Sequence, residues 1–239
     1  MYGIYARIFS MAKKAVIIYG APGAGKGTQA NLLSWAKGFT HFDTGKYLEQ
    51  LVNDPNQRTD PVIKREGKLF DAGKLLTPSW VLSIVKEKTQ EIAKANFSIV
   101  YSGSPRTLYE AFGDKNESGL IEVLERAYGK ENIFVVLLKV RPNSSIFRNS
   151  NRKVCSACAT AILYNDTTHR HTICPICGAK LRTRTLDDPK VIKVRLKEYE
   201  KRTKPILAEL KKKGYKILEI DGEALPFQVH EDIKRKLKI

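Results

Sequence analysis

The four cysteines of this 239-residue chain all lie in one short segment. Cys155 and Cys158 are separated by two residues, and Cys174 and Cys177 repeat that spacing after a gap of fifteen. Two thiolates two residues apart can bind one ion from a tight turn, and two such turns complete a tetrahedral shell. The spacing therefore predicts a zinc site. Disulfides are the alternative, which a cytosolic setting disfavours.

A shell of four cysteines leaves no open position for water or substrate, so the predicted role of the metal is structural. A segment of roughly 35 residues has too small a core to fold alone, and the metal would replace hydrophobic burial. His169 and His171 lie in the same segment. We expect them to be exposed, because the cysteines already fill the metal shell.

A second motif is the glycine-rich sequence GAPGAGKGT (20–28), which directly follows an apolar run. Glycines let backbone N–H groups wrap around phosphate, a following helix adds its positive end, and a lysine supplies a full charge. The strict P-loop has Ser or Thr directly after this lysine; here Gly27 intervenes and the hydroxyl falls on Thr28. The motif predicts an ATP-binding turn made by Gly23, Ala24, Gly25, Lys26, Gly27 and Thr28.

The elements that would position these motifs follow from the hydrophobic pattern. Short apolar runs predict buried strands at 15–20, 40–45, 97–103, 133–140 and 215–222. Longer helical stretches lie between them, and two begin at a capping residue followed by proline, Thr77-Pro78 and Asp188-Pro189. Strands that alternate with helices predict an α/β fold: a five-stranded parallel sheet with helices on both faces.

Two segments interrupt the alternation and are expected to be insertions into a sheet-centred core. We predict a leader at 1–14, outside the core, an insert at 45–77, and a lid at 148–186 that carries the cysteines. The core itself is predicted from three stretches, 15–44, 78–147 and 187–239.

The composition limits the class of protein. The chain carries 42 Lys and Arg against 25 Asp and Glu, a formal charge of +17, which favours phosphorylated small molecules or nucleic acid as partners. The basic runs at 211–216 and 234–239 are typical of solvated helix faces. No apolar run approaches the roughly 18 residues of a membrane span. We expect a cytoplasmic protein that does not enter membranes.

The P-loop variant Gly-x-Pro-Gly-x-Gly-Lys-Gly-Thr-Gln resembles that of the adenylate kinase family. Further motifs similar to those of that family follow in the same order: DTGKYL (43–48), DAGKLLT (71–77), SGSPRT (102–107), FRNSNR (147–152), RTLDD (184–188) and VRLKEY (194–199). The resemblance runs from about residue 15 to residue 222. It implies a P-loop NTPase fold in which 45–77 binds the nucleoside monophosphate (NMP) and the zinc-stapled lid closes over ATP.

The resemblance implies a monomeric kinase that transfers the γ-phosphate of Mg²⁺-bound ATP to AMP and yields two ADP. Lys26 and Arg148 would bind ATP, and Arg106 would bind the acceptor's phosphate. Arg152, Arg184 and Arg195 would gather around the transferred group, and Thr44, Gly103 and Glu110 fall at NMP-binding positions. Phosphoryl transfer needs in-line positioning and positive charge, and the acceptor phosphate needs no general base because it is already anionic.

Three residues depart from the family pattern. Ser102 replaces an aspartate that helps hold hydrated Mg²⁺, Glu49 replaces an arginine expected at the acceptor phosphate, and Glu110 replaces a glutamine that reads adenine. A carboxylate offers acceptors only, so Glu110 also suits bases other than adenine. The loss of the arginine at 49 would be offset if Arg58, Lys64 or Arg65 took its place.

Asp43 stands at the end of the second predicted strand, where the family usually has serine. We hypothesise that it takes over the role of the missing aspartate in the second shell of Mg²⁺; a helix-capping aspartate is the alternative. Two other functions compete with an adenylate kinase. One is a kinase for a different NMP or a small metabolite, and the other is a nucleic-acid-binding P-loop protein with a zinc ribbon, which the motifs at 71–77 and 102–107 disfavour.

Overall fold

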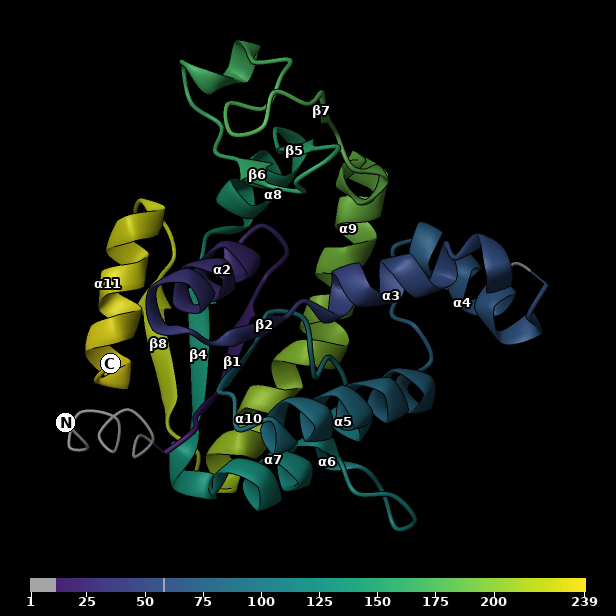
Figure 1. The fold of residues 1–239 in the computed structure, drawn as a ribbon, viewed down its shortest axis with the longest axis vertical. Coiled ribbons are helices and arrows are strands. Elements are labelled where there is room, and N and C mark those ends of the chain that lie inside the picture. Colours follow the sequence, from purple (N-terminus) through teal and green to yellow (C-terminus); the bar gives the residue numbers. More distant parts are fainter. Residues whose placement is uncertain (1–11, 58) are drawn as a thin grey trace, which may run out of the picture.

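A computed structural model describes residues 12–57 and 59–239. Most of the predicted leader, and Arg58, lie outside the described residues. The core is a five-stranded sheet in the order β2-β3-β1-β4-β8 (Figure 1). Its strands are β1 (Ala15–Gly20), β2 (Thr40–Phe42), β3 (Ile99–Tyr101), β4 (Ile133–Lys139) and β8 (Ile217–Asp221). All pairings are parallel, which confirms the predicted sheet.

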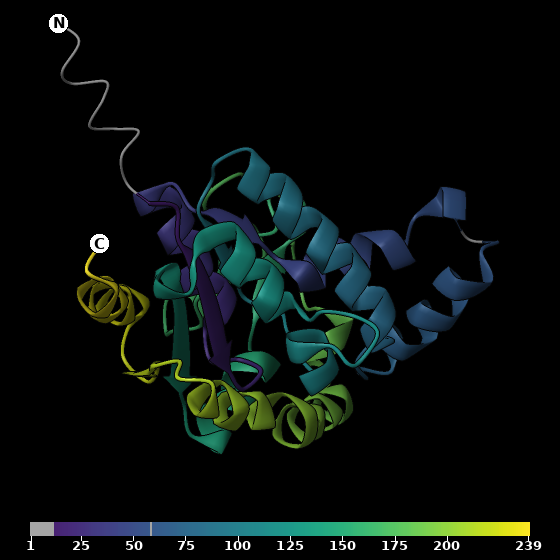
Figure 2. The same ribbon diagram turned by 90° about the horizontal axis from the view of Figure 1, so that it is seen from below.

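The central strand β1 explains why helices cover both faces of the sheet. All six of its residues are buried, and alternate side chains enter two different hydrophobic cores. Ile17 and Tyr19 pack into the larger core and Val16 and Ile18 into the other. The larger core is covered by α5 (Pro78–Lys94), α6 (Leu108–Phe112), α7 (Leu120–Tyr128) and α10 (Lys204–Lys212), and the other by α2 (Lys26–Lys37) and α11 (Pro226–Leu237) (Figures 1 and 2).

The two predicted helix starts differ in how they are capped. Helix α9 (Pro189–Glu198) begins as predicted, and Asp188 accepts a hydrogen bond from the Lys190 N–H. Helix α5 also begins at Pro78, but the Thr77 side chain does not cap it. Its hydroxyl donates instead to Glu66 Oε1 at 2.6 Å. The predicted cap at Thr77 was therefore wrong in its chemistry, because a tertiary partner takes the hydroxyl.

The segment 45–77 projects from the core beside α9 (Figures 1 and 2). It contains α3 (Thr44–Val52), a 3₁₀ turn (Pro55–Gln57) and α4 (Pro61–Asp71). The fully buried carboxylate of Glu66 in α4 accepts from both the N–H and the hydroxyl of Thr77, at 2.8 and 2.6 Å. These charge-assisted bonds fasten α4 to the end of the segment, at the residue just before α5.

The cysteine segment follows α8 (Pro142–Ser150) and lies at the top of the view in Figure 1. It forms a small antiparallel sheet in the order β6-β5-β7. The strands are β5 (Lys153–Cys155), β6 (Ala161–Ile162) and β7 (Leu181–Arg182). Val154 pairs with Ala161 on one side and with Arg182 on the other, so both ends of the segment meet in neighbouring strands.

The chain between α9 and α10 departs from regular α-helix. Residues Tyr199–Thr203 form a π-helical turn, and Pro205 lies in the first turn of α10. A proline cannot donate an N–H within a helix, so the wider turn accommodates the bond that is missing. Among the residues that the structure describes, no helix is both long and apolar enough to cross a bilayer.

Candidate active site and metal centre

The glycine-rich turn between β1 and α2 has the geometry of a phosphate cradle. Gly23 and Gly25 have φ of 83° and 90°, a region that favours glycine. A Cβ at Gly23 would lie 2.5 Å from Asn149 Nδ2, so α8 packs directly against the turn. The Lys26 ammonium folds back and donates to the carbonyls of Gly20 and Ala21, at 2.8 and 2.9 Å.

One large cavity, of about 1080 Å³, connects the glycine-rich turn, the 45–77 segment and the cysteine segment. The structure brings most of the predicted site residues to its wall. Those that line it are Gly23, Ala24, Gly25, Lys26, Gly27, Thr28, Asp43, Gly103, Arg106, Arg148, Arg152, Arg184 and Arg195. Thr44 and Glu110 do not line it.

Lys26, Arg106, Arg152, Arg184 and Arg195 form a cation cluster in this cavity. Burial, together with the charges of Arg106, Arg195 and Arg152, lowers the pKa of Lys26 to about 7. Burial likewise lowers the pKa of Arg195 to about 9, assisted by Arg106 and Arg152. The cations depress one another because they converge on a single space. A polyphosphate in that space would relieve the repulsion.

Asp187 is a site residue that the sequence reasoning did not single out. Its fully buried carboxylate forms a bidentate pair with Arg152, in which Arg152 Nε donates to Oδ2 at 2.9 Å. Arg195 Nη1 lies 3.8 Å from the same carboxylate and donates to the Leu186 carbonyl at 3.1 Å. A bidentate pair fixes the plane of the guanidinium, so Asp187 orients two members of the cation cluster.

Arg106 extends from the loop after β3 toward the start of α3. Its Nε donates to the Gly103 carbonyl at 2.6 Å. A Cβ at Gly103 would lie 3.1 Å from Arg106 Nη2, and one at Gly45 would lie 3.4 Å from it, so glycines give the guanidinium its room. Burial lowers the pKa of Arg106, while Glu110 and Asp43 oppose the shift.

Glu110 serves its own loop rather than the cavity. Its carboxylate is 3% exposed and accepts from the Arg106 N–H at 2.8 Å and from the Thr107 hydroxyl at 3.0 Å. Burial raises the pKa of this carboxyl, although the bonds from Arg106 and Thr107 oppose that. Thr44, the first residue of α3, is buried and its hydroxyl has no partner within the described chain. The predicted NMP-binding roles of both residues stay predictions.

The end of β2 presents two polar groups to the cavity. Asp43 Oδ1 accepts from the Lys46 N–H at 3.1 Å and caps α3. Within the described residues, no hydrogen bond reaches the second oxygen. His41 places one ring nitrogen 2.7 Å from Asn31 Oδ1 and the other 2.8 Å from Ser102 Oγ. Because the amide oxygen only accepts, the Ser102 hydroxyl donates to His41. His41 was missed by the sequence reasoning.

Glu49, which stands in place of an arginine, contacts the cation cluster directly. Its carboxylate accepts from Arg184 Nη2 at 3.1 Å and so connects α3 to the end of the cysteine segment. Lys64 and Arg65 do not line the cavity, and Arg65 pairs with Glu66 at 2.8 Å. Neither therefore takes the place of the missing arginine in this conformation.

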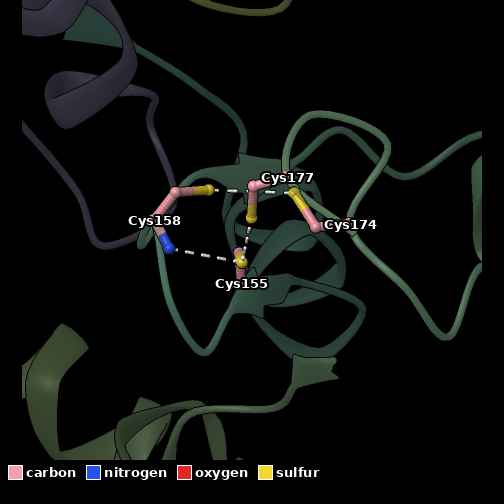
Figure 3. A group of neighbouring side chains, drawn as sticks. All are labelled: Cys155, Cys158, Cys174 and Cys177. Carbon is pink, nitrogen blue, oxygen red and sulfur yellow. Dashed lines mark hydrogen bonds between the residues drawn. The ribbon is translucent and has the colours of Figure 1, made fainter. Parts of the chain in front are cut away.

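The four cysteines come together as predicted (Figure 3). None is in a disulfide, and their sulfur atoms all lie within 4.8 Å of one another. Cys155 Sγ is 3.4 Å from Cys177 Sγ, and Cys158 Sγ is 3.7 Å from Cys174 Sγ. Four sulfurs at Zn–S bonds of about 2.3 Å would be separated by roughly 3.8 Å in a tetrahedron. The cluster is therefore compatible with one zinc ion.

Backbone N–H groups surround the sulfurs, as a thiolate cluster requires. Ala157 and Cys158 donate to Cys155 Sγ at 3.4 Å, and Ile176 donates to Cys174 Sγ at 3.4 Å. The pKa of Cys158 is lowered to about 6, chiefly by hydrogen bonds to the side chain and backbone of Thr160. His169 and His171 are half-exposed rather than fully exposed, and they are not part of the cysteine cluster.

A phosphate-cradling turn, a convergent cation cluster and a parallel α/β sheet define a P-loop nucleotide phosphotransferase. Comparison with known proteins gives the family. The adenylate kinase family profile matches residues 18–215. The chain is 34% identical to an adenylate kinase of Chlamydia pneumoniae, over 93% of this chain and 97% of that protein. It is 31% identical to one of Petrotoga mobilis, over 93% and 94%. The chain belongs to the adenylate kinase family.

Proposed function

We propose that this protein reversibly transfers the γ-phosphate of ATP to AMP and yields two ADP. The observation that carries the proposal is the convergence of five cations from five separate segments on one cavity at the glycine-rich turn: Lys26, Arg106, Arg152, Arg184 and Arg195. Family membership and relatives named adenylate kinase support the same activity.

The residues divide the work as follows. The glycine-rich turn and Lys26 hold the β- and γ-phosphates of ATP, and Arg148 binds at the nucleoside side, where its Nη1 already donates to the Gly222 carbonyl at 2.7 Å. Arg106 holds the acceptor's phosphate. Arg152, Arg184 and Arg195 neutralise the charge that spreads over the transferred group. Closure of the lid (148–186) over the core and of the insert (45–77) over the acceptor excludes water.

An assay of ADP formation from Mg²⁺-bound ATP tests the proposal, with AMP, GMP, CMP, UMP and dTMP offered separately. Turnover with AMP alone would support it. Turnover with another NMP would favour the second candidate, a kinase for that nucleotide, which Glu49 and Glu110 make the main competitor. No turnover with any of the five would contradict both. Salt-sensitive binding to nucleic acid with little response to NMP would then favour the nucleic-acid alternative.

The Glu49–Arg184 pair leads to a prediction for acceptor binding. The carboxylate pairs with Arg184, one of the three arginines assigned to the transferred group, and it places a negative charge where the family has an arginine for the acceptor's phosphate. Both side chains are about one quarter exposed. A partly exposed pair contributes about 1 kcal/mol. We expect Glu49→Gln to lower the KM for the acceptor about fivefold, without changing the affinity for ATP.

The matched control is Glu122→Gln, which removes another ion-paired glutamate, on α7 and outside the cavity wall. Steady-state kinetics at saturating ATP would measure the effect. A rise in the acceptor KM would mean that Glu49 holds Arg184 in its productive position, and would contradict competition.

Asp43 fits the role of a carboxylate near Mg²⁺. It lines the cavity, its charge acts on Lys26, and one of its oxygens is not engaged. Mg²⁺ prefers oxygen ligands and keeps much of its water. When bound, the ion would neutralise charge between the β- and γ-phosphates of ATP. Asp43 would orient that hydrated ion in place of the aspartate that Ser102 replaces.

Asp43→Asn separates the two roles of this residue, since asparagine caps helices about as well as aspartate. We expect phosphotransfer to fall about a hundredfold, a loss typical of one preorganised electrostatic group. Nucleotide binding without metal should be unchanged, and binding of ATP with Mn²⁺, followed by electron paramagnetic resonance, should weaken. Near-normal turnover and an unaltered Mn²⁺ signal would leave Asp43 as a helix cap only.

We further propose that one structural Zn²⁺ binds Cys155, Cys158, Cys174 and Cys177. The 45–77 segment is proposed as the NMP-binding insert, and residues 148–186 as the lid. A monomer that handles nucleotides rather than nucleic acid fits these assignments.

A further inference from the structure

His41 is a polar side chain on the cavity wall that the proposed mechanism does not use. It belongs to β2 and lines the active-site cavity together with Ser102, the residue that follows β3. His41 Nε2 lies 2.8 Å from Ser102 Oγ, and His41 Nδ1 lies 2.7 Å from Asn31 Oδ1 on α2. Asn31 lines the same cavity, so the three side chains form one continuous chain of hydrogen bonds along its wall.

The direction of these hydrogen bonds follows from the chemistry of the three groups. Burial lowers the pKa of His41, although the charge of Asp43 opposes the shift. The ring is therefore neutral at pH 7, and only one of its nitrogens carries a hydrogen. Asn31 Oδ1 can only accept, which puts that hydrogen on Nδ1. Nε2 must then accept from the Ser102 hydroxyl, which leaves the lone pairs of Ser102 Oγ as acceptors.

The sheet places Ser102 between the phosphate cradle and Asp43. Strand β3 lies between β1, which leads into the glycine-rich turn, and β2, which leads to Asp43. Tyr101 of β3 pairs with Phe42 of β2 on one side and with Ile17 of β1 on the other. Asp43 and Ser102 thus follow two paired residues and lie side by side at the carboxyl edge of the sheet. Parallel α/β sheets bind their ligands outside this edge.

A fixed acceptor in this cavity calls for a ligand group that can donate. The cation cluster supplies donors for phosphate, and the phosphate oxygens of ATP can only accept. Water molecules bound to a cation do donate, and Mg²⁺ keeps several of its waters when it binds nucleotide phosphates. An Oγ whose hydrogen is turned away toward His41 therefore suits the hydration shell of the metal ion that accompanies ATP.

We propose that His41, held in turn by Asn31, is a positioning residue that fixes the Ser102 hydroxyl so that its oxygen accepts a hydrogen bond from a water molecule of Mg²⁺-bound ATP. The inference rests on the part of the proposed function that places the ATP phosphates at the glycine-rich turn. Asp43 would bring a negative charge to the same hydrated ion, and Ser102 a neutral acceptor beside it. Without His41 the hydroxyl could rotate, and its lone pairs would no longer have a fixed direction.

The tautomer of His41 tests the direction of the hydrogen bonds in the unaltered protein, without any ligand. NMR correlation of the ring nitrogens with the ring hydrogens at pH 8 should show a protonated Nδ1 and an unprotonated, hydrogen-bonded Nε2. The Nε2 signal should move in Ser102→Ala, which removes its donor. A hydrogen on Nε2 in the wild type would overturn the proposal, because Ser102 would then be occupied as the acceptor of His41.

Binding of ATP with Mn²⁺, followed by electron paramagnetic resonance, tests the consequence for the metal. His41→Phe and Ser102→Ala should each weaken this binding about fivefold, the effect of one lost hydrogen bond, and leave the binding of metal-free ATP unchanged. The double variant should lose no more than either single variant, because both changes remove the same interaction. His169→Phe is the matched control, since His169 does not line the cavity and should leave the binding at its wild-type strength.

Losses that multiply in the double variant, or that are equally large without metal, would overturn the proposal. Ser102→Asp gives a further reading: a carboxylate accepts in any rotation, so adding His41→Phe to it should change nothing more. These measurements need no acceptor nucleotide. A protein that binds Mn²⁺ with ATP but phosphorylates no NMP would contradict the proposed function and still test His41, whereas absence of ATP binding would overturn both.

Discussion

Lys26→Met is expected to lower kcat about a hundredfold to a thousandfold, the usual cost of removing one preorganised charge from a transition state. The surroundings of Lys26 add a second expectation. Among the residues that the structure describes, the ammonium donates only to the Gly20 and Ala21 carbonyls, and burial with neighbouring arginines lowers the pKa of Lys26 to about 7. At pH 8 roughly nine-tenths of the free protein should carry a neutral Lys26.

Bound ATP reverses this shift, because an adjacent polyanion favours the charged form. Binding at pH 8 should therefore take up nearly one proton per ATP at Lys26, and the affinity should fall as the pH rises above 7. Calorimetry in buffers with different heats of ionisation would measure the uptake. Lys26→Arg is the control, since arginine stays charged and should abolish this uptake. Equal uptake in wild type and Lys26→Arg would place the titrating group elsewhere.

Local signals account for the parts of the fold that the sequence predicted well. The apolar run at 15–20 is short and ends in a glycine-rich sequence, which together indicate a buried strand followed by a turn, so β1 and the phosphate cradle were predictable together. The paired cysteines were predictable for the same reason: each pair needs only its own turn to aim two sulfurs at one point.

The contacts that tune the site were not predictable, because they join residues that only the tertiary fold brings together. Glu49 and Arg184 are 135 positions apart, and Glu66 takes the Thr77 hydroxyl from the helix that was expected to use it. Asp187 and Asp188 are neighbours of the same type. Only the fold shows that Asp188 caps α9 while Asp187 orients Arg152.

Removing zinc is expected to unfold the lid but leave the sheet intact. Beyond the four cysteines, the lid has little to hold it: short β6 and β7 strands, and exposed apolar side chains such as Ile173 and Ile176. Structural zinc contributes about 10–16 kcal/mol in small metal-dependent domains. We expect one zinc per chain, and rapid proteolysis between β5 and β7 once the metal is removed, while the core fragments stay protected.

Unfolding of the lid should also reduce catalysis, because the lid positions two arginines of the cation cluster. Arg152 directly precedes β5 and Arg184 follows β7, and the Val154–Arg182 pairing holds these two strands side by side. A displacement of about 1 Å in a positioned group can cost a hundredfold in rate. Cys174→Ser should therefore lose zinc and at least that much of kcat, whereas His169→Ala should keep both. If the zinc-free protein resists proteolysis and turns over as well as the zinc-bound protein, the pairing of strands β5 and β7 alone maintains the lid.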